Sequence, residues 1–255
     1  MTINGQKVAL VTGAARRIGR VIALALARRG WDVAVHYGHS ETEALATVRE
    51  IEALGRRAAA IQCDLSSEAA VKTLLSRAAA ALGPVSCVVN NAALFEHDTA
   101  TDFSMAAMDR HMHVNLAAPV LLAQSLYDAT TAQSQSVVIN LLDQKLFNLN
   151  PDFLSYTLSK AALHSATTML AQALAPKVRV AGIAPGITLV SGDQTEEGFA
   201  KAHTVTPLGK SSTPEDIAAA ICFVAESPAI TGTTLVVDGG QHLIPLQRDV
   251  MFVAK

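Results

Sequence analysis

The sequence predicts an α/β fold, a single domain in which helices cover both faces of a seven-stranded parallel sheet. Short β-branched runs alternate with longer amphipathic segments through nearly all 255 residues, which is the pattern of repeated β-α units. Several runs are apolar at every position, as strands buried on both faces must be. Only 4% of the residues are aromatic while half are hydrophobic, so Ala, Val, Ile and Leu fill the interior. These observations indicate one doubly wound, Rossmann-type domain over residues 1–255.

The expected elements follow from apolar spacing and from glycine and proline punctuation. The strands are expected at residues 7–11, 32–36, 58–62, 85–90, 136–142, 179–183 and 234–237. The helices are expected to end at 30, at 55 and at 83, then to span about 104–130 and 155–175, with one more after 214. Ser66 is the expected N-cap of the third helix. Residues 188–212 show no clear period, so we expect them to form a substrate flap over a site.

Composition and charge exclude several classes of function. The chain carries 20 Lys and Arg against 22 Asp and Glu, a net charge of -2, which argues against a nucleic-acid partner. Its longest stretch poor in charge, residues 113–127, contains Asn115, Gln124 and Ser125, so neither a membrane span nor a membrane partner is expected. The apolar run at residues 8–11 is too short for a signal-peptide core. We therefore expect a cytoplasmic protein with a small-molecule substrate.

The cysteines and histidines predict neither disulfides nor a metal site. Cys63, Cys87 and Cys222 are scattered through apolar surroundings, as reduced core residues are. His111 and His113 are two residues apart on an expected helix, so they point in different directions, and we expect them to be solvated.

A glycine turn follows the first strand and opens the first helix, which is the context of a dinucleotide-binding site. The first glycine suits a tight turn, and the last one allows the helix to pack closely. An arginine stands where the commoner motif has its middle glycine. The free N–H groups at the helix start suit pyrophosphate oxygens, although an ordinary strand–turn–helix is the alternative. The residues assigned to the cofactor here are Thr12, Gly13, Arg16, Arg17, Ile18 and Gly19.

The end of the second strand distinguishes the two nicotinamide cofactors. An acidic residue there would bond a free ribose 2′-hydroxyl and repel a 2′-phosphate. This chain has none, and with Arg17 nearby it offers a cation, imidazoles and a hydroxyl to a phosphate. NADP(H) is therefore favoured over NAD(H), with a polar loop and N-cap as the alternative. The residues assigned to the cofactor in this segment are His36, Tyr37, His39 and Ser40.

Tyr156 and Lys160 are four residues apart, so on a helix they project from one face. A lysine ammonium beside a phenol lowers the pKa of the phenol. Tyr156 is then a candidate general acid, which protonates the atom that becomes electron-rich as hydride arrives at its neighbour. A surface pair without chemistry is the alternative for this spacing taken alone.

Further motifs occur in one order along nearly the whole chain. They are Thr12-Gly13 with Gly19, Cys63-Asp64-Leu65, Asn90-Asn91-Ala92, Asn115, Tyr156 with Lys160, Pro185-Gly186 and Asp238-Gly239-Gly240. In these motifs the chain resembles the short-chain dehydrogenase/reductases. The resemblance implies a homotetramer built on the long helices after the fourth and fifth strands.

The same resemblance implies roles for single residues. Asp64 would hold the adenine, Asn90 would support the cofactor, and Asn115 would fix a water chain behind Lys160. Lys160 would also hold the nicotinamide ribose, and Thr188 would touch the nicotinamide end. The remaining cofactor residues that it implies are Leu65, Asn91, Ala92, Pro185 and Gly186.

Asp143 stands thirteen residues before the tyrosine, where the family usually has a serine that holds the substrate oxygen. An ionised carboxyl group only accepts hydrogen bonds, so it repels the oxygen of a ketone and suits an N–H donor. We therefore expect a nitrogen heterocycle as substrate, although a strand-end carboxylate that caps a backbone turn is the alternative.

The subgroup with this aspartate is the pteridine reductases, and the bacterial dihydromonapterin reductases look similar. By this resemblance Phe95 and the nicotinamide sandwich a pterin ring, Arg17 reaches phosphate and substrate, and Asp143 bonds the amino edge or relays a proton through Tyr156. The expected reaction is NADPH-dependent reduction of a ring C=N bond. The chain departs from the subgroup at Ala93 and in the tail after Gly240. The alternatives are a ketone or 3-oxoacyl reductase and a cofactor-binding sensor without turnover.

Overall fold

A single parallel sheet of seven strands organises the chain, with strand order β3-β2-β1-β4-β5-β6-β7. The computed structural model describes residues 7–190, 195–204 and 206–253. The strands are β1 Val8–Val11, β2 Asp32–Tyr37, β3 Ala58–Gln62, β4 Cys87–Asn90, β5 Ser136–Leu141, β6 Val178–Pro185 and β7 Thr234–Val237. The predicted fold class is confirmed, and the order reverses between β1 and β4, where doubly wound sheets bind ligands.

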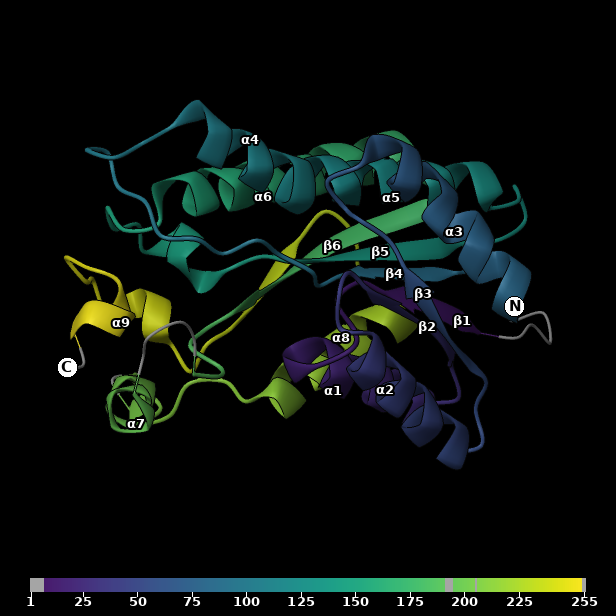
Figure 1. Ribbon diagram of the computed structural model, residues 1–255, viewed down its shortest axis with the longest axis horizontal. Coiled ribbons are helices and arrows are strands. Elements are labelled where there is room, and N and C mark those ends of the chain that lie inside the picture. Colours follow the sequence, from purple (N-terminus) through teal and green to yellow (C-terminus); the bar gives the residue numbers. More distant parts are fainter. Residues whose placement is uncertain (1–6, 191–194, 205, 254–255) are drawn as a thin grey trace.

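Helices cover both faces of this sheet (Figure 1). One layer consists of α1 Arg17–Arg28, α2 Glu41–Ala53 and α8 Pro214–Glu226. The other consists of α3 Glu68–Leu82, α4 Met105–Met112, α5 Ala118–Ala129 and α6 Leu154–Leu174. Two short helices, α7 Glu196–Thr204 and α9 Val250–Val253, lie apart from both layers and in contact with each other.

The two layers bury separate cores because side chains alternate along each strand. In β1, Ala9 and Val11 pack in the core below α1 and α8, while Val8 and Leu10 pack in the core below α3 and α5. All four side chains are fully buried. A strand that is apolar at every position therefore supplies both cores.

Three local expectations need correction. The expected helix over 104–130 is interrupted by a π-helical turn, His113–Ala117, which places Asn115 between α4 and α5. The N-cap of α3 is Ser67, whose hydroxyl accepts from Ala70 N, because Ser66 already bonds Asp64 Oδ1. His111 is buried instead of solvated, and it bonds Ala107 O.

The segment 188–212 contains a helix, α7, that its sequence pattern did not predict. Only small residues of this helix are buried, Gly198 and Ala202, so no apolar stripe marks it. Within the described residues, no helix is both long enough and apolar enough to span a bilayer. Residues 191–194 and 205 of the expected flap lie outside the described part of the chain.

Candidate active site

Two adjoining cavities lie along the carboxyl ends of the central strands. The first, of about 440 Å³, is lined by the glycine turn and the end of β2. The second, of about 410 Å³, is lined by the ends of β5 and β6, by α6 and by the C-terminal segment. Arg17, Ile18, Asn91 and Ala93 line both cavities, so the two form one continuous cleft. An extended ligand can therefore bridge the two halves of the sheet.

The glycine turn is braced against the end of β4. The hydroxyl of Thr12 accepts hydrogen bonds from the N–H groups of Asn91, at 2.9 Å, and Ala92, at 3.0 Å. The Asn91 amide donates in return to Thr12 O at 2.8 Å. Gly13 has a φ of +63°, which favours glycine. Thr12 is thus buried behind the turn, while Gly13 and Asn91 face the first cavity.

Helix α1 starts so close to this turn that only glycine fits at its third position. A Cβ on Gly19 would lie 2.1 Å from Gly13 O. The N-cap residue Arg16 makes no side-chain cap, and no acidic residue lies in the first turn. The N–H groups at this helix start are therefore available to an anion, as a dinucleotide pyrophosphate requires.

The end of β2 presents Tyr37, His39 and Ser40 to the first cavity, and none of its lining residues in the described chain is acidic. His36 lies behind the turn instead. Its Nδ1 accepts from Gly13 N at 3.0 Å, and its Nε2 is 3.1 Å from Cys63 O. Burial lowers the pKa of His36 to about 4. His36 therefore supports the turn as a neutral imidazole and offers no cation to a phosphate.

Among the other predicted cofactor residues, Asn90, Asp64 and Leu65 line neither cavity. Asn90 is buried, and its amide donates to Asn140 Oδ1 at 2.8 Å. Asp64 accepts from Ser66, and hydrogen bonds from Ser66 lower the pKa of Asp64. Leu65 belongs to the core below α3. Pro185, Gly186 and Thr188 do line the second cavity.

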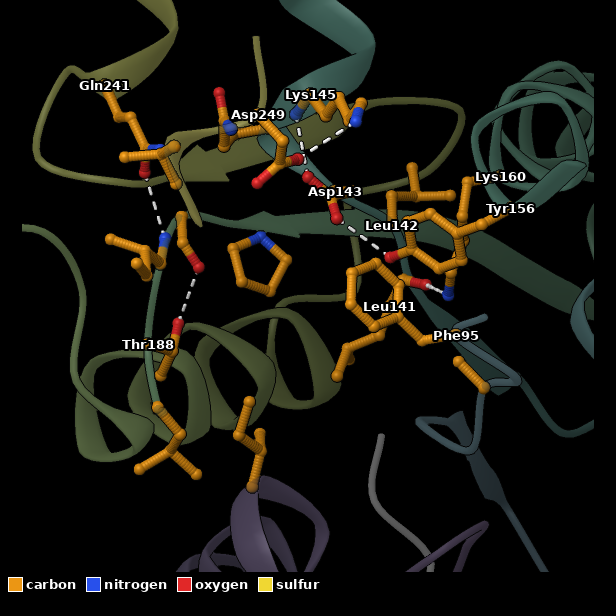
Figure 2. Close-up of a pocket in the computed structure, with 18 of the residues that line it drawn as sticks. Phe95, Leu141, Leu142, Asp143, Lys145, Tyr156, Lys160, Thr188, Gln241 and Asp249 are labelled. Carbon is orange, nitrogen blue, oxygen red and sulfur yellow. Dashed lines mark hydrogen bonds and ion pairs between the residues drawn. The ribbon is translucent and has the colours of Figure 1, made fainter. Parts of the chain in front are cut away.

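Tyr156, Asp143 and Lys160 meet in the second cavity (Figure 2). The Tyr156 hydroxyl donates to Asp143 Oδ2 at 2.8 Å. The ammonium of Lys160, also on α6, donates to Leu141 O at the end of β5 at 2.7 Å. The ring of Phe95 stands edge-on to the Tyr156 ring at 4.7 Å. The structure therefore brings all four predicted residues to one place.

The electrostatics of this cluster correct one expectation. Burial raises the pKa of Tyr156 well above its ordinary value, and the charge of Asp143 raises it further. Burial also raises the pKa of Asp143 and lowers the pKa of Lys160 to about 8. Lysine does not lower the pKa of the tyrosine here, because its ammonium bonds a backbone carbonyl and the carboxylate bonds the phenol. Tyr156 therefore keeps its proton.

Asn115, in the π-helical turn, ties the loop after β4 to α6. Its amide nitrogen donates to Leu94 O and to Ser159 Oγ, both at 2.9 Å, and its oxygen accepts from Leu94 N at 2.8 Å. It is buried and does not line either cavity. Asn115 thus fixes the loop that carries Phe95 and the residue next to Lys160.

Sequence reasoning missed the wall of the second cavity that the C-terminal segment builds. Gln144, Lys145, Gln241, Asp249 and Val250 line this cavity. Asp152, which is buried, accepts from Arg248 Nε at 2.9 Å and from Asp249 N at 2.7 Å. These partners are about a hundred residues apart in sequence, and no periodic pattern joins them.

Comparisons with known proteins agree with this geometry. A family model described as enoyl-(acyl carrier protein) reductase matches residues 13–242. An L-rhamnose 1-dehydrogenase (NAD(P)(+)) of Sphingomonas sp. is 32% identical, covering 93% of this chain and 96% of that protein. A 3-oxoacyl-[acyl-carrier-protein] reductase of Synechocystis sp. is 33% identical, covering 94% of this chain and 98% of that protein.

Solved structures are also similar to this chain. The crystal structure of FolM alternative dihydrofolate reductase 1 from Brucella canis, complexed with NADP, is 40% identical with a TM-score of 0.88. The match covers 93% of this chain and 95% of the Brucella canis chain. A short chain dehydrogenase from Burkholderia cenocepacia in complex with NADP is 33% identical with a TM-score of 0.85, covering 92% and 97%.

The names of these relatives give different substrates, yet each match runs nearly from end to end. The family match spans the glycine turn, the Tyr156–Lys160 pair and the last strand of the sheet. What the relatives have in common is therefore the whole catalytic domain and not one shared motif. This chain belongs to the short-chain dehydrogenase/reductase family of oxidoreductases.

Proposed function

We propose that this protein is an NADPH-dependent reductase of a C=N bond in a pterin or dihydropterin ring. The observation that carries the proposal is the 2.8 Å hydrogen bond from the Tyr156 hydroxyl to Asp143 Oδ2 inside the second cavity. A carboxyl group next to the catalytic acid suits a substrate with ring nitrogens and N–H groups, because it accepts hydrogen bonds from them. It does not suit a carbonyl oxygen that gains negative charge.

The first cavity fits a dinucleotide with a 2′-phosphate. The uncapped start of α1 would receive the pyrophosphate, and Arg17, His39 and Ser40 would hold the phosphate on the ribose. Lys160 and Thr188, which line the second cavity, would hold the nicotinamide ribose and contact the nicotinamide end. Similar structures contain NADP, which supports this assignment.

When bound, NADPH would supply the hydride that the ring carbon receives. The Tyr156 hydroxyl gives its proton to the adjacent ring nitrogen, so the C=N bond becomes CH–NH. Asp143 then takes up a proton from solvent and passes it to the Tyr156 oxygen across their hydrogen bond. Burial raises the pKa of Asp143, which makes this uptake easier.

Phe95 supplies an apolar surface for the flat ring. One face of its ring stacks on Phe153 with a centroid distance of 4.3 Å, and its edge meets Tyr156. The side chain is 40% exposed and lines the second cavity. A pterin packed against it would lie beside the Tyr156 hydroxyl.

A ketone or 3-oxoacyl reductase is the second candidate, because one relative with that activity in its name is 33% identical. Its substrate oxygen would face the acceptor Asp143 in place of a hydroxyl donor. Loss of one donor to a developing oxyanion costs about 3 kcal/mol. This cost favours the pterin.

We also propose a cytoplasmic homotetramer with a flap over the substrate. Exposed apolar side chains on α6, Leu158 and Met169, support a subunit contact. The three buried free cysteines suit a reducing compartment. At the start of the flap, Val190 O accepts from Arg17 Nη2 at 2.9 Å, which links segment 188–212 to the cofactor turn. Light scattering of the purified protein tests the oligomeric state.

The test of function is NADPH consumption with a 7,8-dihydropterin, a 3-oxoacyl thioester and a quinone-type ketone in parallel. We expect preference for the dihydropterin, and its loss in Asp143→Ser. Turnover of ketones alone would overturn the pterin assignment and leave a ketone reductase. NADPH binding without any turnover would indicate a protein that senses the cofactor.

A further inference from the structure

Gln144 has a buried polar atom with nothing to bond it. It directly follows Asp143 as the first residue of a short 3-10 turn, Gln144–Phe147, and it lines the second cavity. Its side-chain oxygen, Oε1, is buried and accepts no hydrogen bond from the described residues. Buried polar atoms are nearly always satisfied, and an unsatisfied one destabilises the protein. Because Gln144 lines the cavity, rotation of its side-chain amide would bring this oxygen to a donor group of a bound ligand, which would satisfy it.

The neighbouring polar groups on this wall are also acceptors. Asp143 lies on one side, and the C-terminal segment brings the carboxylate of Asp249 to the same cavity (Figure 2). The charge of Asp249 helps to raise the pKa of both Asp143 and Tyr156, so it is felt at the reaction centre.

The nearby cation is committed to the protein. Lys145 Nζ donates to Asp152 O at 2.6 Å and to Asp249 Oδ2 at 2.9 Å, and its side chain is 3% exposed. Its backbone N–H donates to Asp143 Oδ1 at 2.8 Å. This wall therefore offers hydrogen-bond acceptors to a ligand, and it suits neutral donors better than an anionic group.

We propose that Gln144 is a specificity-determining residue, whose side-chain carbonyl accepts a hydrogen bond from an N–H or O–H group of the substrate. This inference rests on the proposed function, since it concerns the part of the pterin that lies beyond the reacting C=N bond. Two parts of such a substrate carry suitable donors, the amino-pyrimidine edge of the ring and the hydroxyls of a side chain at C6. The chemistry at Gln144 is the same for both.

Gln144→Leu tests the inference, because it removes the amide and keeps most of the volume. Gln133→Leu, at an exposed position away from both cavities, is the matched control. The substrates are a dihydropterin with a hydroxylated C6 side chain, its 6-methyl counterpart, and the 6-methyl compound without the ring amino group. We expect KM to rise about tenfold for a substrate that donates to Gln144, with kcat and NADPH affinity nearly unchanged.

The pattern across the substrates identifies the donor. A rise for the hydroxylated compound alone assigns the side-chain hydroxyls, and a rise for both amino compounds but not the third assigns the ring edge. An unchanged KM for all substrates would overturn the inference, and so would a loss of thermal stability without a change in KM. In either case the pterin function stands, because the wild type reduces the dihydropterins.

If the proposed function is wrong, the wild type reduces no dihydropterin. In that case the KM values of the wild type and of Gln144→Leu are compared for a hydroxyketone and for its deoxy analogue. A KM increase in the variant that is confined to the hydroxyketone supports Gln144 as an acceptor for a substrate hydroxyl. Equal KM values for wild type and variant overturn that role. Inactivity with every substrate overturns both proposals.

Discussion

The two ends of the cleft are built in different ways. At the cofactor end, the glycine turn and the start of α1 offer backbone N–H groups, and buried side chains such as Thr12 and His36 hold the turn from behind. At the substrate end, side chains form the surface, and they come from α6, the turn after β5 and the C-terminal segment. Main-chain geometry suits the cofactor, which enzymes with different substrates have in common. Side chains suit the substrate, which differs from one enzyme to another.

The largest effect is expected for Tyr156→Phe. It removes the proton that Tyr156 donates to Asp143 and, in the proposed reaction, to the substrate. General acid catalysis contributes up to about 10,000-fold, so we expect kcat to fall by roughly 1,000-fold. NADPH affinity, measured by fluorescence titration, should not change, because the phenol belongs to the substrate end. A decrease in kcat of less than about tenfold would show that another group supplies the proton.

Asp143→Asn is expected to reduce kcat by about 100-fold, because an amide cannot relay a proton to Tyr156. The same substitution is expected to increase stability relative to the wild type at higher pH. Burial raises the pKa of Asp143 in the folded protein, so the stability that its protonated form contributes is present at low pH and is lost as pH rises through the folded-state pKa.

Asp143→Asn lacks this titration. The Tm of the variant minus the Tm of the wild type should therefore increase as pH rises. Differential scanning at about pH 5 and about pH 8 tests the sign. A Tm difference that does not depend on pH would mean that Asp143 ionises as freely in the folded state as in the unfolded state. Parallel NADPH titrations should show the same affinity for both proteins.

The sequence predicted local motifs at both ends of the cleft, but it did not predict the C-terminal wall of the substrate end. The glycine turn, the missing acid after β2 and the Tyr156–Lys160 spacing are local patterns, and local patterns fix local backbone. The wall of Gln144 and Asp249 depends on Asp152 pairing with Arg248, which lies in a segment without periodicity. The direction of the pKa shift of Tyr156 also depends on its burial and on the acceptors that Tyr156 and Lys160 bond. The four-residue spacing in the sequence gives neither of these.

At the cofactor end, Gly19→Ala is expected to destabilise the turn. The added Cβ would lie 2.1 Å from Gly13 O, a backbone atom that cannot rotate away. Overpacking of this kind costs about 2 kcal/mol, and NADPH affinity should fall roughly 30-fold with it. Gly38→Ala is the matched control, because Gly38 lines the same cavity and a Cβ there meets nothing within 4 Å. Equal effects of the two changes on urea unfolding would refute the close packing of α1.

The smallest effect is expected for Arg248→Ala. This variant also tests most directly whether the cofactor end and the substrate end of the cleft are independent. Arg248 is 53% exposed but pairs with Asp152, which is 2% exposed, and this pair anchors the segment that carries Asp249. An ion pair with an exposed partner is worth about 1 kcal/mol or less, so we expect substrate KM to rise by up to about fivefold. Arg110→Ala is the control, since its pair with Glu96 is exposed on both sides and lines neither cavity. If Arg248→Ala instead weakened NADPH binding, the C-terminal segment would serve the whole cleft, and the two ends could not be treated as separate.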